Sequence, residues 1–305
     1  MKPTHLVSIQ DLNSRQLLEL LKNARAMKKA KKPSRKLAGK TLGLIFQKPS
    51  VRTRVSFEVG MGQLGGQSLY IGPVELEQGK RESAKDMALV LSRYLDAIVT
   101  RTFSHSDVVE MAEVSSVPVI NGLSDESHPC QALADLLTVQ ERTGKLAGVP
   151  IAYVGDGNNV CHSLMESCAL AGAKLSIATP KGYAPDPKIT GWSKQQAKKT
   201  GGQILLTEDP VEAVHGARVV YTDVWTSMGQ EKEKAERIRI FNPYQVNESL
   251  MRKAAPNAWF MHCLPAHRGE EVTGAVIDSP RSIVYDQAEN RMHAQKAVLL
   301  MLLER

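Results

Sequence analysis

Residues 41–60 read TLGLIFQKPSVRTRVSFEVG, and residues 151–169 read IAYVGDGNNVCHSLMESCA. Each stretch joins a short apolar run to a turn of small or polar residues and then to a helix-like sequence. This order is typical of a parallel α/β sheet, in which the turn lies at the carboxyl end of the strand. Free backbone N–H groups and the helix dipole favour anions there. The two stretches therefore predict two α/β units and a cleft that holds two ligands.

Short apolar runs and helical stretches continue to alternate around both segments. The pattern predicts two doubly wound parallel-sheet domains, which fits a length of 305 residues. A run rich in Ala, Leu and Gln predicts an interdomain helix over 130–143, and Gly144 places the boundary near residue 140. The predicted strands are 41–46, 68–71, 97–100, 117–120, 151–154, 174–178, 203–206, 218–222 and 258–262. The predicted helices include 12–27, 51–64, 83–94 and a last helix over 288–303.

The excess positive charge of the chain is local. The chain has 39 Lys and Arg against 32 Asp and Glu, and the net charge of +7 alone indicates a polyanionic partner such as nucleic acid. Residues 1–40 hold eleven basic and two acidic residues, so the remaining chain has 28 against 30, a net of −2. No aromatic residue occurs in 1–40 to stack on bases. We expect a solvated surface beside an amphipathic helix, whose apolar side carries Leu17, Leu18, Leu20 and Leu21.

Several protein classes do not fit the sequence. No apolar run reaches the roughly 18–20 residues of a membrane helix, and the N-terminal sequence MKPTHLVSIQDLNS lacks the apolar core of a secretory signal. The GDGNN turn lacks the third glycine of a dinucleotide fingerprint, so we expect no such cofactor. Cysteines without CxxC spacing fit reduced thiols in the cytoplasm; they are Cys130, Cys161, Cys168 and Cys263.

The turn at residues 50–54, SVRTR, is the sharpest candidate for an anion site. Ser50 is placed to cap a helix that begins at Val51, and the first N–H groups of that helix point into solvent. Arg52 adds a planar guanidinium suited to two phosphate oxygens, and the Ser50 and Thr53 hydroxyls supply further donors. No GxxxxGK[ST] loop occurs in the chain, so nothing implies a nucleotide with Mg²⁺. The alternative is a capped helix with two solvated arginines.

His128 and Gln131 form a second cluster at the start of the predicted interdomain helix. They are three residues apart, so they can share one face of the first turn. A histidine at a helix N-terminus stays neutral because the dipole opposes its protonation. A neutral histidine suits a hydrogen-bond donor to a developing oxyanion better than a general acid. A His and a Gln without function are the alternative.

A third cluster, His262-Cys263-Leu264-Pro265, ends another predicted strand. A metal site would need two further ligands at usable spacing, so we predict none. A Cys263 nucleophile activated by His262 is conceivable. Adjacent strand residues point to opposite faces, however, so we expect these two side chains to diverge.

Residues 223–229, DVWTSMG, also follow a predicted strand, and the charged stretch 230–239 comes directly after them. The segment fits either a mobile lid or a solvated surface loop.

Seven motifs together resemble the ornithine carbamoyltransferases, within the aspartate/ornithine carbamoyltransferase superfamily. The resemblance implies a carbamoyl-phosphate-binding domain at 1–140 with helix 288–305, and an ornithine-binding domain at 141–287. It also implies a last helix that returns to the first domain, a homotrimer with shared active sites, no cofactor and a cytoplasmic location. The motifs, in the family's order, are KPSVRTRVSFE (48–58), DMALVLSRY (86–94), HPCQALADLLT (128–138), GDGNNV (155–160), DVWTSMGQE (223–231), HCLPAHRGEEV (262–272) and ENRMHAQKAV (289–298).

The family's binding roles carry over to the matching positions of this chain. The resemblance assigns carbamoyl phosphate to Ser50, Val51, Arg52, Thr53, Arg101, His128, Gln131, Cys263, Leu264 and Arg291. It assigns ornithine to Asn159, Asp223, Ser227 and Met228.

The resemblance further implies that the δ-amine of L-ornithine attacks the carbamoyl carbon, giving L-citrulline and phosphate. The catalytic roles fall on Arg101 and His128, which stabilise the oxyanion, and on Cys263, which orients the amine. The resemblance also implies that Asp223 binds the α-ammonium group of ornithine. Aspartate and putrescine are the rival acceptors: aspartate needs further cations for its second carboxylate, and putrescine lacks the α-carboxylate that Asn159 would hold.

Two positions depart from the family pattern. Val51 replaces the usual Thr, which removes a hydroxyl donor but keeps the backbone N–H. The Gln that a neighbouring subunit contributes in the family falls on Glu77, beside Gln78, so that contact stays unassigned.

Overall fold

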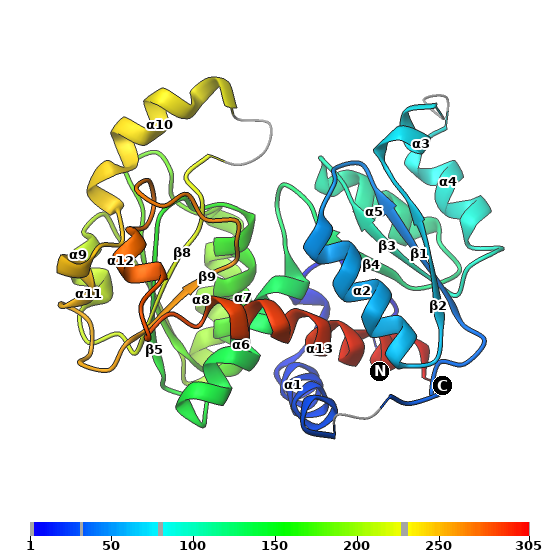
Figure 1. Ribbon diagram of the computed structural model, residues 1–305, viewed down its shortest axis with the longest axis horizontal. Coiled ribbons are helices and arrows are strands. Elements are labelled where there is room, and N and C mark those ends of the chain that lie inside the picture. The colour runs from blue at the N-terminus through cyan, green and yellow to red at the C-terminus, as the bar shows by residue number, and fades with distance from the viewer. Residues whose placement is uncertain (1–2, 31–32, 79–81, 227–230, 305) are drawn as a thin grey trace. The chain divides into compact units, whose positions relative to one another are not determined.

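The computed structural model describes residues 3–30, 33–78, 82–226 and 231–304, which divide into two compact units (Figure 1). Unit 1 comprises Met1–Leu137 and Asn290–Arg305, and unit 2 comprises Thr138–Glu289. The chain passes from one unit to the other within helices α6 (Pro129–Thr143) and α13 (Val284–Leu303). Each unit holds an all-parallel sheet with helices, and α13 returns the chain to unit 1, so the predicted fold class is confirmed.

The sheet of unit 1 has four strands in the order β2-β1-β3-β4. The strand order reverses between β1 and β3, the kind of switch point where open α/β sheets bind ligands. Phe46, the last residue of β1, pairs with Arg101, the last residue of β3, so both strands end side by side. The strands are β1 (Thr41–Phe46), β2 (Gln67–Ile71), β3 (Ala97–Arg101) and β4 (Val119–Leu123).

Helices pack on this sheet through apolar side chains. Buried residues of β1, β3 and β4 form one core cluster with Ala88 of α4 and with Val108 and Met111 of α5. Helix α2 lies close to α13, since a Cβ on Gly60 would lie 3.2 Å from Cγ of Lys296. The helices of unit 1 are α1 (Ser14–Ala30), α2 (Val51–Gln63), α3 (Pro73–Gln78), α4 (Ala84–Leu91) and α5 (His105–Val114), with a 3₁₀ turn at Ile9–Asp11.

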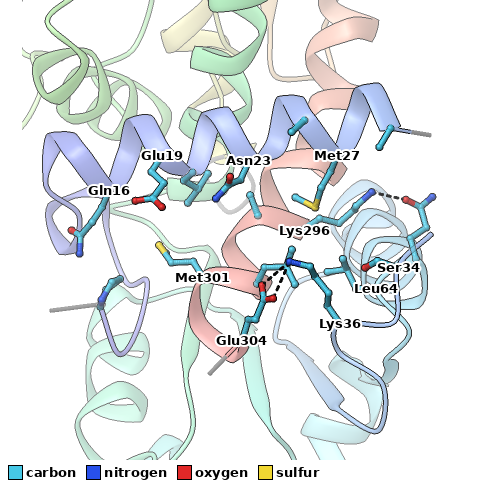
Figure 2. A pocket seen from close by; sticks show the side chains of 17 residues that line it. Gln16, Glu19, Asn23, Met27, Ser34, Lys36, Leu64, Lys296, Met301 and Glu304 are labelled. Carbon is cyan, nitrogen blue, oxygen red and sulfur yellow. Dashed lines mark hydrogen bonds and ion pairs between the residues drawn. The ribbon is translucent and has the colours of Figure 1, made fainter. Parts of the chain in front are cut away.

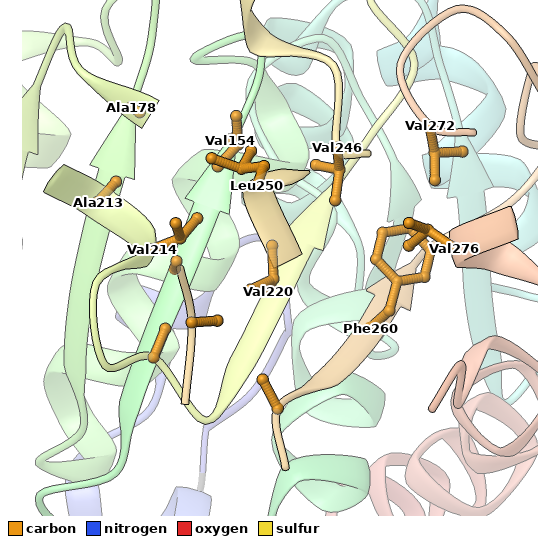
Figure 3. Close-up of a cluster of buried hydrophobic side chains, with 14 of the residues drawn as sticks. Val154, Ala178, Ala213, Val214, Val220, Val246, Leu250, Phe260, Val272 and Val276 are labelled. Atoms are coloured by element: carbon orange, nitrogen blue, oxygen red, sulfur yellow. The ribbon is translucent and has the colours of Figure 1, made fainter. Parts of the chain in front are cut away.

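The sheet of unit 2 has five strands in the order β7-β6-β5-β8-β9, and its switch point lies between β5 and β8. One face carries a core cluster of small and branched side chains around Val220 and Phe260 (Figure 3). The strands are β5 (Pro150–Val154), β6 (Lys174–Ala178), β7 (Gln203–Thr207), β8 (Val219–Thr222) and β9 (Trp259–His262). The helices are α7 (Asn159–Ala171), α8 (Pro187–Thr200), α9 (Pro210–Val214), α10 (Lys234–Phe241), α11 (Glu248–Met251) and α12 (Gly274–Ile277), with 3₁₀ turns at Glu231–Glu233 and Asn242–Tyr244.

Several predicted boundaries were wrong, among them the ends of α1, which spans Ser14–Ala30 rather than 12–27, and the end of β4 at Leu123 rather than at residue 120. Strand β4 begins at Val119 rather than at residue 117, because Pro118 has no N–H and ladder pairing starts one residue later. Helix α4 ends at Leu91 rather than at residue 94, where the Ser92 hydroxyl turns back to donate to the Ala88 carbonyl. Helix α13 begins at Val284, four residues before the predicted start. Among the helices built from the described residues, none has the length and apolarity that a bilayer crossing requires.

The apolar side of α1 is narrower than predicted. Leu17, Leu20 and Leu21 are buried, whereas Leu18 is 44% exposed. Residues three and four apart share a helix face, and Leu18, one position after Leu17, falls outside the stripe that faces the core.

This difference gives a matched test of core packing. Leu17→Ala is expected to lower the free energy of unfolding by about 2–5 kcal/mol, because it removes fully buried methyl groups and leaves a cavity. Leu18→Ala is expected to change it by less than about 1 kcal/mol, because its side chain is already half in water. Urea unfolding of both variants followed by circular dichroism measures the difference. Equal losses would contradict this orientation of α1.

Candidate active site

The start of helix α2 is built as the sequence predicted. Ser50 is the N-cap, and its Oγ accepts the Thr53 backbone N–H at 3.4 Å. The Ser50 hydroxyl also donates to the Thr53 hydroxyl at 3.0 Å, and Arg291 Nη2 of α13 donates to that same Thr53 oxygen at 2.8 Å. Thr53 is buried, whereas the side chains of Val51 and Arg52 are exposed. The cap therefore joins α2 to α13 through one hydroxyl group.

His128 is buried within unit 1 and is surrounded by positive charge. Burial lowers the pKa of His128 well below 6.5, and the nearby guanidinium groups of Arg291, Arg101 and Arg52 lower it further. The predicted neutral state is thus supported, but by burial and three arginines rather than by the helix dipole. The structure places three predicted arginines around one neutral imidazole. An arrangement of this kind is suited to a small anion.

Gln131 lies one turn into α6 and is also buried. Its Nε2 donates to Asp135 Oδ1 at 2.8 Å, which fixes the amide. Its Oε1 is enclosed and accepts no hydrogen bond from any described residue. A buried acceptor without a donor is costly, so this oxygen is available for an N–H group of a ligand.

Sequence reasoning missed Lys48, in the turn after β1. Lys48 is buried, and its Nζ lies 4.6 Å from the centroid of the Phe103 ring. Burial lowers the pKa of Lys48, the neighbouring Arg101 lowers it further, and Asp125 opposes both effects. Lys48 therefore adds a further cation beside Arg101 at the end of the central strands. The sequence could have indicated Lys48 by its position between a predicted strand and the predicted Ser50 N-cap.

Asp223 is the centre of the candidate residues in unit 2. Asn158 Nδ2 donates to Asp223 Oδ2 and Cys263 Sγ donates to Asp223 Oδ1, both at 2.9 Å. Asn158 Oδ1 also accepts two backbone N–H groups at the start of α7, so the same amide caps that helix. Asn159, which the resemblance had selected, is the first residue of α7, and its Oδ1 accepts the Val160 N–H. Asn158, which the resemblance did not select, therefore contacts Asp223 directly, and the ornithine role of Asn159 stays a prediction.

The expected divergence of His262 and Cys263 was wrong. A ring nitrogen of His262, Cys263 Sγ and an Asp223 carboxylate oxygen all lie within 4.8 Å of one another. Strand β9 ends at His262, and Leu264 has a φ of +58°, so strand alternation does not extend to Cys263.

His262 nevertheless serves neither as a base for Cys263 nor as a metal ligand. Its Nδ1 accepts the Leu264 backbone N–H at 2.9 Å, so its proton sits on Nε2, which donates to Glu271 Oε1 at 3.2 Å. Both ring nitrogens are used, and neither has a lone pair for a proton or a metal. The role of His262 is to shape the loop that holds Cys263 and Leu264.

A buried ion pair lies beside Asp223 and was also missed. Arg237 of α10 donates to the Asp156 carboxylate and to the Trp225 carbonyl, and its side chain is 4% exposed. Burial raises the pKa of Asp156 to about 6 although Arg237 favours its charged form, and Asp223 raises it further. Ser227 and Met228, the remaining predicted residues, lie outside the described residues.

A cavity in unit 1 lies away from the predicted residues. It has a volume of about 510 Å³ and lies between α1 and α13 (Figure 2). Two of the cationic side chains that line it are engaged: Lys36 pairs with Glu304 at 2.9 Å, and Lys296 donates to Gln63. No candidate residue described above lines this space, so its volume does not mark the active site.

Comparison with known proteins identifies the family. The sequence pattern described as "Aspartate/ornithine carbamoyltransferase, carbamoyl-P binding domain" matches residues 4–141, and that of the Asp/Orn binding domain matches 147–302. A protein of Thermococcus kodakarensis named "Ornithine carbamoyltransferase" is 56% identical over 301 residues, which cover 98% of this chain and 96% of the relative. The chain belongs to the ornithine carbamoyltransferase family. A protein of Pyrococcus furiosus named "Ornithine carbamoyltransferase, anabolic" is 55% identical, with the same coverage.

Solved structures of the family agree with the fold. The ornithine carbamoyltransferase from Pyrococcus furiosus superposes with a TM-score of 0.95 at 54% identity, covering 99% of this chain and 97% of that one. The ornithine carbamoyltransferase from Thermus thermophilus gives a TM-score of 0.91 at 45% identity, covering 99% and 100%. The similarity therefore extends over both units.

The turn that precedes Asn158 leaves no room for a side chain at Gly157. A Cβ there would lie 2.4 Å from Pro185 N and 2.5 Å from the Tyr183 carbonyl oxygen, both backbone atoms. We expect Gly157→Ala to displace the turn and lower the melting temperature. Gly191→Ala is the control, because it lies within α8 with open space around it and should raise stability by about 0.5–1 kcal/mol. Scanning calorimetry compares the two, and a Gly157→Ala protein as stable as the parent would refute the close packing.

Proposed function

We propose that this chain transfers the carbamoyl group of carbamoyl phosphate to the δ-amine of L-ornithine, giving L-citrulline and phosphate. Relatives with 55–56% identity over nearly the whole chain carry the name ornithine carbamoyltransferase. One of these relatives is named as anabolic, which supports a role in arginine biosynthesis. The proposed domains are residues 1–140 with 288–305 for carbamoyl phosphate, and 141–287 for ornithine.

The charges of unit 1 support the carbamoyl phosphate assignment. Phosphate binds the N-terminus of α2 through the Ser50 and Thr53 hydroxyls, the Val51 N–H and Arg52, with Arg291 on the far side of Thr53. The exposed side chain of Val51 fits a contact through its backbone alone. The enclosed Gln131 Oε1 accepts an N–H of the carbamoyl group.

The surroundings of Asp223 are the observation that carries the ornithine assignment. Asp223 is 5% exposed, and among the described residues its carboxylate accepts hydrogen bonds from the neutral groups of Asn158 and Cys263. Within the described residues no cation forms an ion pair with Asp223. A buried carboxylate without an ion-pair partner favours the binding of an ammonium group. Ornithine supplies its α-ammonium here, with Asn159, Ser227 and Met228 completing the site. Aspartate would need added cations in unit 2 for its second carboxylate.

The chemical step is an acyl-type transfer. The free δ-amine forms a C–N bond to the carbamoyl carbon, the C–O bond to phosphate breaks, and the amine proton passes to the departing phosphate. Arg101 and the neutral His128 donate to the oxygen that becomes negative, a contribution worth about 10²–10³ in rate per donor. Cys263 and Leu264 border the carbamoyl carbon. Cys263 orients the δ-amine, and its own position is fixed by its hydrogen bond to Asp223.

A direct assay tests this function. The protein is mixed with carbamoyl phosphate and with ornithine, aspartate or putrescine in turn, and citrulline and phosphate are measured. We expect turnover with ornithine only. Arg52→Ala should raise the KM for carbamoyl phosphate by about tenfold or more, because a charge-assisted phosphate contact is lost. The absence of turnover with ornithine, or a KM within twofold in Arg52→Ala, would contradict the corresponding assignment.

We further propose that the protein is a cytoplasmic homotrimer. An apolar stripe on α2 supports an interface between copies: Val51, Val55 and Val59 recur every four residues and are 78%, 48% and 44% exposed. Residues at this spacing share one helix face, and a solvent-exposed apolar face of this kind marks an association surface.

Introducing charged residues into the valine stripe of α2 tests the proposed interface. A Val55→Glu, Val59→Glu double variant should move the solution mass from three chain masses toward the single-chain 33.5 kDa, because two carboxylates would be buried at the interface. Val211→Glu on α9, a valine 45% exposed in unit 2, is the control and should leave the mass unchanged. Light scattering after gel filtration measures the mass. A trimer that survives both glutamates would place the interface elsewhere.

A further inference from the structure

Arg237 is a buried cation that links two separate turns of unit 2. Its Nη2 donates to Oδ2 of Asp156, and its Nε donates to the carbonyl oxygen of Trp225. The guanidinium also lies 4.9 Å from the Tyr183 ring centroid and 5.2 Å from that of Phe241. Two of its donors are thus used in different directions, and aromatic rings hold its plane.

Arg237 contacts the two turns, at Asp156 and at Trp225, that position Asp223. Asp156 follows β5 and lies two residues before Asn158, whose amide donates to Asp223 at 2.9 Å. Trp225 follows β8 and lies two residues after Asp223 itself. One guanidinium therefore fixes the backbone on both sides of the Asn158–Asp223 hydrogen bond. A shift of either turn would move the carboxylate relative to its amide donor.

The carboxylates of Asp156 and Asp223 are neighbours, and Arg237 is the cation that pairs with one of them. Besides burial, the nearby Asp223 carboxylate raises the pKa of Asp156, and Tyr153 and Cys161 are buried titratable groups beside them. Arg237 forms its ion pair with Asp156, while the Glu233 carboxylate lies 3.5 Å away at the exposed side of the guanidinium. Arg237 neutralises Asp156, and among the described residues Asp223 has no ion-pair partner. An ammonium ligand can then bind Asp223 and no second acid competes for it.

We propose that Arg237 is a positioning residue for ornithine, which holds the turns at Asp156 and Trp225 so that Asp223 faces the α-ammonium. This inference rests on the proposed function. It assigns a role to a residue of the charged stretch 230–239, whose pattern is otherwise that of a solvated surface. A lysine cannot replace Arg237, because a single ammonium on a flexible stem does not supply two donors in a fixed plane.

Charge-conserving variants test this role. Arg237→Lys keeps the positive charge but loses the planar fork, and Asp156→Glu keeps the negative charge but displaces the guanidinium by one methylene. We expect each to raise the KM for ornithine by about tenfold or more, because small displacements of a positioning group have effects of this size. The KM for carbamoyl phosphate should stay within twofold, since its proposed residues in unit 1 are untouched. Steady-state kinetics with the other substrate saturating measure both constants.

Arg239→Lys is the matched control. Arg239 lies on the same helix, is exposed, and should leave both KM values unchanged. The parent protein must turn over ornithine for the comparison to apply, so a failure of the proposed function is seen separately in the unmodified chain.

The possible results separate positioning from a purely structural ion pair. A selective rise in the ornithine KM in Arg237→Lys supports the proposal. Parent-like kinetics, or a loss of kcat and melting temperature with both KM values unchanged, would overturn it, because a structural pair affects the folded fraction and not the affinity for one substrate. If Arg237→Lys does not fold, Asp156→Glu decides by the same criterion.

Discussion

Parallel strand pairing is the constraint on which every candidate residue of this chain depends. In unit 1 the register of β1 with β3 sets Phe46 opposite Arg101, so the chain leaves the sheet at the same edge toward Ser50 and toward Thr102. In unit 2, Tyr153 of β5 pairs with Tyr221 of β8, so Gly155 and Asp223 follow at equivalent positions. Each pair of strand ends flanks the point where the strand order reverses. A shift of one residue in either register would turn these side chains to the opposite face of the sheet.

The same local physics explains why the elements were readable from the sequence. Strand β1 is a short, largely apolar run that is buried on both sides, and it ends where the run ends. The Ser50 cap was readable because it needs only a hydroxyl and an N–H three residues apart. Boundaries went wrong where a backbone detail decided them, as with the missing N–H of Pro118 and the hydroxyl of Ser92.

Interactions between distant residues were beyond such reasoning. Arg237 and Asp156 are 81 positions apart, and neither the charged stretch around Arg237 nor the GDGNN turn indicates that they meet. The hydrogen bond from Asn158 to Asp223 likewise joins two turns that are 65 positions apart in the sequence. The approach of His262 to Cys263 follows from the left-handed backbone of Leu264, an uncommon state for a residue with a side chain. The family motifs supplied these positions as a set but not the contacts that hold them.

The distribution of buried charge gives the two units opposite tasks. In unit 1, Arg291, Arg101 and Arg52 lie near the buried His128, and Lys48 lies near Arg101. Burial is the main cause of the lowered pKa values of His128 and Lys48, and the neighbouring arginines lower both further. A group of cations of this kind attracts an anionic ligand. In unit 2, Arg237 forms an ion pair with Asp156, one of two neighbouring carboxylates. Among the described residues, the other carboxylate, Asp223, accepts hydrogen bonds from the neutral groups of Asn158 and Cys263, which fix its orientation. Under the proposed function, the anionic substrate binds beside the cations of unit 1 and the ammonium group of the second substrate binds Asp223 of unit 2.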